Sequence, residues 1–204
     1  MNGSMEKIDF NATNFSGFDN NEKILIDTGV ILALANEYDA WHNTVKNLFN
    51  KYIFSEDEVS QEQNDGEEQE EKAIFLFINP TVLNEITHLA DKPFKQYKNN
   101  HPNEDLSTID PKDVINNTIN GVQELIENDV LLIVDGTKDT ALKQIEIFKD
   151  IEEAADAVNL SIANEFNLNF LTVDNKLVNK MEKIKNKLSK INRVYYTTRI
   201  HRSY

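Results

Sequence analysis

The stretch ILIDTGVILALAN at residues 24–36 decides the fold. A run of branched apolar residues meets one carboxylate, Asp27, and a second apolar run follows after Thr28 and Gly29. The first run is typical of a short strand buried in a parallel sheet. Because an unpaired charge at the border of a core is costly, Asp27 either caps the next helix or is held at the strand end for a chemical task.

The rest of the chain alternates apolar runs with stretches of helical periodicity, and this predicts an α/β fold, a three-layer α/β/α sandwich around a central parallel sheet. Asn79-Pro80 is a helix-start signal. In the helix expected over 137–149, Ala141, Leu142, Ile145 and Phe148 recur at helical spacing and are predicted to face inward. We expect a loop over 91–111, strands at 23–27, 73–78, 130–134, 170–174 and 193–197 (the last at the sheet edge), and helices at 30–36, 40–52, from 80 onward, 114–128, 137–149, 151–166 and 175–188.

The length of 204 residues suits one domain. Residues 1–21 are polar and Asn-rich, which predicts a flexible N-terminal tail. The domain is then expected over 22–200, with an acidic disordered insertion at about 55–72, where nine acids accompany one lysine.

Composition excludes several classes of function. The net charge of −14 argues against nonspecific binding of nucleic acid through bulk charge. The absence of cysteine excludes disulfides and thiolate chemistry and fits a cytoplasmic protein. No apolar run approaches the roughly 20 residues of a transmembrane helix, so no membrane partner is expected.

Four acids stand out by position. Asp27 and Asp174 each close a predicted strand, and the carboxyl ends of parallel strands share one edge of a sheet. Glu85 follows the second strand, and Asp156 interrupts an Ala-rich helix, where aspartate is unfavourable. Singly, each acid can be a helix cap or a solvated side chain. Together they predict a cleft that needs a hard cation, Mg²⁺ or Mn²⁺, and that suits phosphodiester hydrolysis.

These motifs resemble the PIN-domain family, metal-dependent ribonucleases that include the toxin halves of bacterial toxin–antitoxin pairs. The resemblance spans about residues 23–198. It is carried by ILIDTGVILALAN at 24–36, DAWH at 39–42, NPTVLNEITHLA at 79–90 and EEAADAVNLSIANEFNLNFLTVD at 152–174.

The resemblance implies a metal-dependent endoribonuclease that binds Mg²⁺ or Mn²⁺ and hydrolyses RNA. It also implies an antitoxin protein as partner and a homodimer. The acids it marks as both catalytic and metal-binding are Asp27, Glu85, Asp156 and Asp174, and the supporting side chains are Thr28, Thr172 and, one helical turn after Asp156, Asn159.

Competing classes leave different signatures. A haloacid-dehalogenase-type phosphatase needs a second acid where Gly29 stands, and a dinucleotide-binding fold needs a richer glycine turn. A catalytically silent PIN-like module that binds RNA or protein remains the alternative. A measurement of metal binding would discriminate between this module and the nuclease. His42 is expected to pack in its turn. The candidate RNA contacts are Lys92–Lys98, Lys176–Lys190, Arg193, Arg199 and Arg202, and the Lys-rich helix at 176–190 could equally form a solubilising face.

Overall fold

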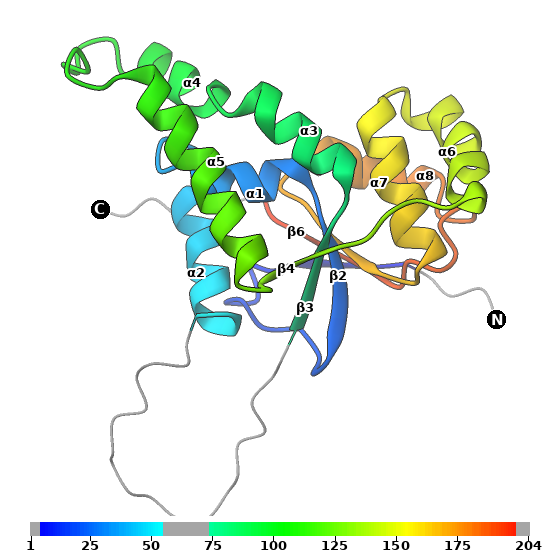
Figure 1. The fold of residues 1–204 in the computed structure, drawn as a ribbon. Coiled ribbons are helices and arrows are strands. Elements are labelled where there is room, and N and C mark those ends of the chain that lie inside the picture. Colours follow the sequence, from blue (N-terminus) through cyan, green and yellow to red (C-terminus); the bar gives the residue numbers. More distant parts are fainter. Residues whose placement is uncertain (1–4, 55–73, 199–204) are drawn as a thin grey trace, which may run out of the picture.

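A computed structural model describes residues 5–54 and 74–198 of the chain (Figure 1). The acidic insertion predicted at about 55–72 lies outside these residues. Six parallel strands form one sheet in the order β1-β6-β5-β2-β3-β4, which confirms the predicted α/β fold. The strands are β1 Glu6–Asp9, β2 Glu22–Ile26, β3 Ile74–Ile78, β4 Leu131–Ile133, β5 Asn169–Leu171 and β6 Arg193–Tyr196.

Helices cover both faces of the sheet, consistent with a three-layer sandwich. Asn79 caps α3 through its side chain, with Pro80 in the first turn, as predicted. In the described residues, no helix is both long and apolar enough to cross a bilayer. The helices are α1 Thr28–Ala35, α2 His42–Tyr52, α3 Pro80–Leu89, α4 Lys92–Asn100, α5 Pro111–Glu127, α6 Lys138–Ile151, α7 Ala154–Glu165 and α8 Asn175–Lys183.

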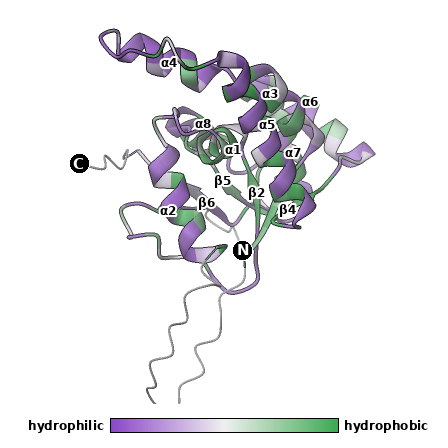
Figure 2. Cartoon of the chain, turned by 60° about the vertical axis from the view of Figure 1, so that its left-hand side comes forward, coloured by the Kyte–Doolittle hydropathy of each residue, from purple (hydrophilic) through white to green (hydrophobic). Residues whose placement is uncertain are grey.

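The two faces of the sheet support two hydrophobic cores. Successive residues of a strand point to opposite faces, so Ile24 and Ile26 of β2 enter one core and Leu25 enters the other. The first core joins the sheet to α1, α2, α3 and α5, and the second joins it to α6, α7 and α8. Helix α1 is apolar on nearly all sides, as its green colour in Figure 2 shows. The sequence after Asp27 is therefore hydrophobic throughout because its helix is enclosed between other elements.

The N-terminal segment is not a flexible tail over the described residues 5–21, so that prediction is wrong. Strand β1 pairs in parallel with β6, and β6 is therefore not the edge strand that the sequence predicted. Three aromatic side chains that follow β1, Phe10, Phe15 and Phe18, are buried in the first core. The polar composition of the segment concealed these widely spaced aromatic anchors, which fix it to the domain.

Two helix predictions also need correction. The segment expected to be a loop over 91–111 contains helix α4. Its proline, Pro93, does not break the helix, because it falls in the first turn, where a missing N–H is tolerated. The break between the helices expected over 137–149 and 151–166 lies further along the chain than predicted: α6 ends at Ile151, Glu152 adopts a left-handed conformation with φ of 63°, and α7 begins at Ala154.

The apolar face predicted for α6 does not point inward. Leu142, Ile145 and Phe148 are exposed to solvent. The residues that bury this helix are Ile147 and Ile151, which pack in the second core. Helix α6 is thus apolar on two sides, and the described part of the chain covers one of them.

Candidate acidic site at the carboxyl edge of the sheet

Asp27 lies where β2 ends and α1 begins. Its Oδ1 accepts a hydrogen bond of 2.8 Å from the backbone N–H of Thr28, so it caps α1. Its Oδ2 accepts a bond of 2.7 Å from the hydroxyl of Thr172, just beyond neighbouring β5. Asp27 is only 7 % exposed. Capping and a position in the candidate site are therefore combined in one side chain, which is fixed at both oxygens.

The environment of Asp27 disfavours its charged form. Burial is the largest cause and raises the pKa of Asp27 to about 6. The hydrogen bonds from Thr172 and Thr28 oppose this shift, whereas the carboxylates of Glu85 and Asp174 add to it. Asp27 therefore lies close enough to Glu85 and Asp174 for their charges to raise its pKa.

Glu85 reaches the site from α3, the helix after β3. The hydroxyl of Thr28 donates a bond of 2.6 Å to Glu85 Oε2. The Thr28 hydroxyl thus joins the start of α1 to Glu85 on α3. Of the two hydroxyls predicted to support the site, Thr172 contacts Asp27 and Thr28 contacts Glu85.

Asp174 follows β5 and caps α8. Its Oδ1 accepts bonds from the backbone N–H groups of Lys176 at 2.7 Å and Leu177 at 3.2 Å. Its own N–H donates to the hydroxyl of Thr172 at 2.9 Å. Thr172 therefore ties Asp27 and Asp174 together, and the Leu-Thr-x-Asp pattern at the end of β5 has a direct structural role.

Asp156 lies in the first turn of α7 and is half-buried. Burial, followed by the charges of Asp27, Glu153 and Asp174, raises its pKa to about 8. Two of these neighbours belong to the predicted set, so the fold brings Asp156 toward Asp27 and Asp174. Glu153, beside Asp156, was not predicted and interacts with it, but the ammonium of Lys180 holds Glu153 at 2.9 Å.

Asn159 is fully buried one turn after Asp156. Its Oδ1 accepts a bond of 2.7 Å from the amide of Asn79. The Oδ1 of Asn79 already caps α3, which fixes the orientation of both amides. Among the described residues, the Nδ2 of Asn159 consequently has no hydrogen-bond acceptor. Asn79 was predicted only as a cap, because its second partner is 80 residues away along the chain.

The carboxylates share one edge of the sheet without forming a compact ligand cage. Among the described residues, no three Asp, Glu, His or Cys side chains are grouped closely enough to hold a metal ion. The donor set nevertheless suits a hard divalent cation, since it consists of carboxylate oxygens whose charges raise one another's pKa. The ligand set that the resemblance implies, Asp27, Glu85, Asp156 and Asp174, stays a prediction.

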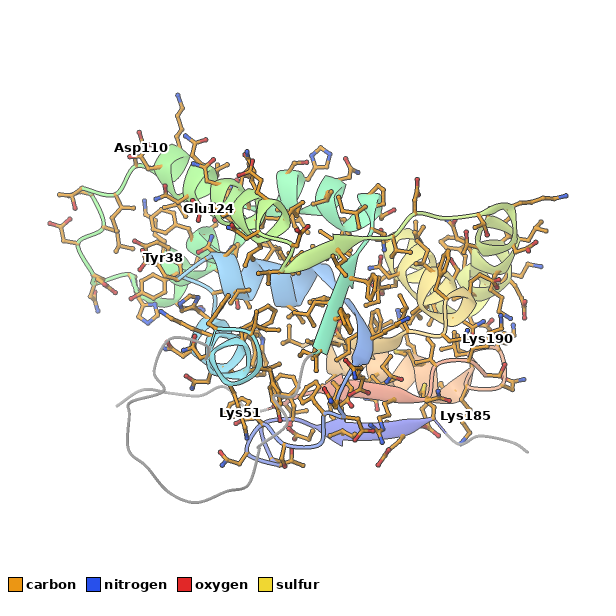
Figure 3. The ribbon with its side chains drawn as sticks, turned by 60° about the horizontal axis from the view of Figure 1, so that its bottom comes forward. Tyr38, Lys51, Asp110, Glu124, Lys185 and Lys190 are labelled. Carbon is orange, nitrogen blue, oxygen red and sulfur yellow. The ribbon has the colours of Figure 1, made fainter. Side chains whose placement is uncertain are left out.

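Six of the ten predicted basic RNA contacts that lie in the described residues are paired with acids of the same chain, among them Lys180 with Glu153. Lys187 pairs with Asp150 at 2.7 Å, and Lys190 approaches Glu165 at 3.5 Å. Figure 3 labels Lys190 and Lys185, and Lys185 pairs with Glu182 at 2.8 Å. Arg193 contacts Glu6, Asp19 and Glu22, and Lys95 contacts Asp91. Arg199 and Arg202 lie outside the described residues. Four of the six lysines between residues 176 and 190 are therefore paired with acids of the same chain.

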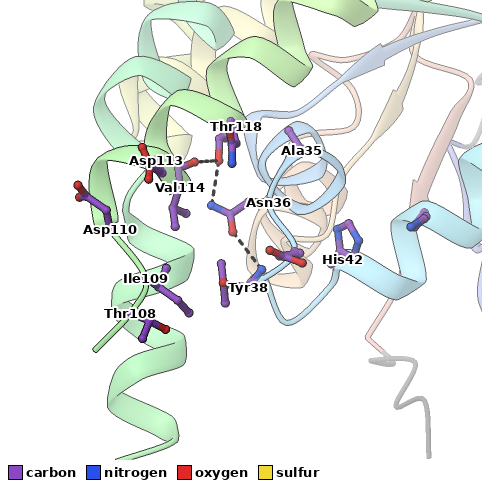
Figure 4. Close-up of a pocket in the computed structure, with 13 residues that line it drawn as sticks. Ala35, Asn36, Tyr38, His42, Thr108, Ile109, Asp110, Asp113, Val114 and Thr118 are labelled. Atoms are coloured by element: carbon purple, nitrogen blue, oxygen red, sulfur yellow. Dashed lines mark hydrogen bonds between the residues drawn. The ribbon is translucent and has the colours of Figure 1, made fainter. Parts of the chain in front are cut away.

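A separate cavity of about 420 Å³ lies at the other end of α1 (Figure 4). The buried amide of Asn36 spans it, donating to Thr118 at 3.0 Å and accepting from the N–H of Tyr38 at 3.0 Å. His42 Nδ1 lies 2.9 Å from the carbonyl oxygen of Ala33, consistent with its predicted packing role. Since α1 has eight residues, this cavity is about 12 Å from Asp27.

The sequence matches no known protein-family model, and no curated protein shows significant similarity to it. The chemistry of the acids themselves therefore carries the interpretation of the site.

Proposed function

We propose that this protein is a metal-dependent endoribonuclease of the PIN-domain type. The observation that carries the proposal is the convergence of acids from four separate elements on the carboxyl edge of β2 and β5, with the pKa raised to about 6 at Asp27 and about 8 at Asp156. Such an arrangement is unfavourable for the fold by itself, and perturbed acids of this kind cluster at functional sites.

The chain's own side chains would prepare the site. Thr172 and the N–H of Thr28 orient the two oxygens of Asp27, and the hydroxyl of Thr28 orients Glu85. Asp27, Glu85, Asp156 and Asp174 would together hold Mg²⁺ or Mn²⁺. When bound, the ion would offset the repulsion among the acids, polarise a phosphoryl oxygen and make water a better nucleophile.

The proposed products are RNA fragments with a 5′-phosphate and a 3′-hydroxyl, which form when water attacks the phosphorus and the P–O3′ bond breaks. Because four lysines in and after α8, Lys180, Lys185, Lys187 and Lys190, are paired with acids of the same chain, we expect few phosphate contacts and a restricted RNA substrate. As the toxin of a toxin–antitoxin pair, the protein would be inhibited by a partner that presents a basic side chain to these acids.

Cleavage of a mixed tRNA and mRNA panel with Mg²⁺ or Mn²⁺ tests the proposal. Asp27→Asn should lower the rate by at least about 100-fold, and EDTA should abolish cleavage. The matched control is Asp113→Asn, which removes one exposed carboxylate from α5 and should leave the rate unchanged.

The opposite results are equally informative. The acids are not gathered at ligand distance, which favours a catalytically silent RNA- or protein-binding module as second candidate. Absence of both cleavage and calorimetric Mn²⁺ binding would reject the enzyme and leave that module. A third outcome is that Mn²⁺ binds, that Asp27→Asn abolishes this binding, and that no RNA in the panel is cleaved. This outcome would support the metal site and show that the panel does not contain the substrate.

A further inference from the structure

Helix α6 exposes an apolar strip that the domain does not cover. Leu142 is 59 % exposed, Ile145 60 % and Phe148 45 %. They are three of the seven large apolar residues that are exposed in the described part of the chain. Because these three lie at successive turns of one helix, they form a continuous surface rather than isolated contacts with water.

The strip has a charge at each end. Lys138, Ile145 and Glu152 are spaced seven residues apart, so they follow one line along the helix. Lys138 begins α6 and Glu152 is its C-cap, and both are exposed. We call the following residues the α6 stripe: Lys138, Ala141, Leu142, Ile145, Phe148 and Glu152.

We infer that the α6 stripe is a contact between two copies of this chain, packed antiparallel about a two-fold axis at Ile145. In this register Ile145 meets Ile145 of the partner subunit, and Leu142 lies opposite Phe148 of the partner subunit. A two-fold axis uses the same surface on both copies, so each contact occurs twice.

Charge complementarity selects the second copy and its orientation. Antiparallel packing about Ile145 sets Lys138 opposite Glu152 of the partner subunit, at both ends of the stripe. Parallel packing would instead set lysine against lysine and glutamate against glutamate. Nearby charges are already paired, as in Lys143–Glu146 and Lys180–Glu153, whereas Lys138 and Glu152 form no ion pair among the described residues.

A hollow beside the stripe offers room for the partner's largest side chain. A cavity of about 250 Å³ lies between α6, α7 and the start of α3, and Ala141 and Gln144 line it. In the antiparallel register, Phe148 of the partner subunit lies opposite Ala141 and Leu142, at the rim of this cavity. The small side chain of Ala141 leaves space there for an aromatic ring.

The size of the α6 stripe determines how tightly we expect the two copies to bind. From Lys138 to Glu152 the helix spans about 21 Å. One such stripe is less than the roughly 800 Å² per partner of a standard interface. We therefore expect a dimer that dissociates at concentrations on the order of micromolar.

Sedimentation velocity on the full chain, from about 1 to 200 µM and without metal or RNA, tests the contact. The mass should rise with concentration from that of the 23.5 kDa chain to twice that value. Ile145→Glu should keep the chain monomeric throughout, because two carboxylates would meet on the axis. Since Ile145 is exposed, this variant should retain the thermal melt of the parent.

A charge exchange tests the register. Lys138→Glu or Glu152→Lys alone should weaken dimerisation by about tenfold, and the double variant should restore it. Lys112→Glu, the same charge change on exposed α5, is the matched control and should have no effect. A chain that is monomeric at every concentration, or a dimer that Ile145→Glu leaves intact, would overturn the contact, and no rescue by the double variant would overturn the register. None of these outcomes depends on nuclease activity.

Discussion

Two buried carboxylates stand at opposite ends of β2, and their surroundings differ. Glu22 is the first residue of the strand and Asp27 follows its last, and each is only 7 % exposed. Glu22 accepts hydrogen bonds from the Tyr195 hydroxyl at 2.7 Å, from the N–H of Asp19 at 3.0 Å and from the amide of Asn169. Asp27 accepts two bonds, from Thr28 and Thr172.

The charges around these two acids differ more than the hydrogen bonds do. Arg193 approaches Glu22 to 3.5 Å and supplies an opposite charge. Asp27 is surrounded instead by Glu85, Asp174 and Asp156, all of the same sign. The two carboxylates are equally buried, but the neighbouring charge stabilises the ionised form of Glu22 and destabilises that of Asp27. Glu22 ties the N-terminal segment to the sheet, whereas the charge of Asp27 does not stabilise the fold, which is typical of a functional residue.

The largest expected contrast is in stability. Glu22→Gln places an amide N–H₂ among donors that need an acceptor, so the free energy of unfolding should fall by about 2 kcal/mol. Asp27→Asn removes a repelled charge and keeps an oxygen to cap α1, so it should not lower that free energy. Urea denaturation at pH 7.5, monitored by circular dichroism, measures both variants. Equal losses in both would contradict the difference between the two ends of β2.

Divalent metal should sharpen the same contrast. At a tenfold excess over its dissociation constant, Mg²⁺ or Mn²⁺ should stabilise the parent chain by about 1.4 kcal/mol, because the ion binds only the folded site. The shift should persist in Glu22→Gln and vanish in Asp27→Asn. Thermal melts with and without EDTA provide the measurement, and an equal shift in Asp27→Asn would place any bound ion elsewhere.

The smallest expected effect is a dependence on pH. The pKa values of Asp27 and Asp156, about 6 and about 8, lie above those of the same groups in the unfolded chain. The folded state therefore binds more protons, and the stability that these groups provide is complete below about pH 4 and lost as pH rises through 6 and 8.

Metal-free protein should accordingly melt at a lower temperature at pH 8.5 than at pH 6.5. Asp156→Asn should reduce the difference, because the group with the higher pKa no longer titrates. Asp113→Asn serves as the control for the loss of one carboxylate, and calorimetry at several pH values gives the comparison. A steeper pH dependence in Asp156→Asn would show that Asp156 is charged throughout this range.

Much of the fold was predictable because strong local signals agree with it. The apolar run before Asp27 and the Asn79-Pro80 start of α3 each specify one element without help from distant residues. The N-terminal segment was missed because β1 depends on β6, and the exposed face of α6 was missed because periodicity shows an apolar side without showing what covers it.

The acidic site was predictable in its location but not in its detail. Asp27 and Asp174 follow neighbouring strands, so the topology sets them at one edge. The bond from Thr28 to Glu85 and the pair Asn79–Asn159 join residues 57 and 80 positions apart, respectively. No sequence spacing encodes such pairs, since they arise from the packing of α1, α3 and α7.

The pairing of β1 with β6 has a consequence for how the protein is made. Glu6 and Arg193 are partners across 187 positions, so β1 cannot pair with β6 until residues 193–196 have been synthesised. Until then the aromatic anchors at 10, 15 and 18 lack part of their core, including Tyr195, which stacks on Phe18. We expect the central strands to form first and the N-terminal segment to dock last, because the loop that it closes is the longest.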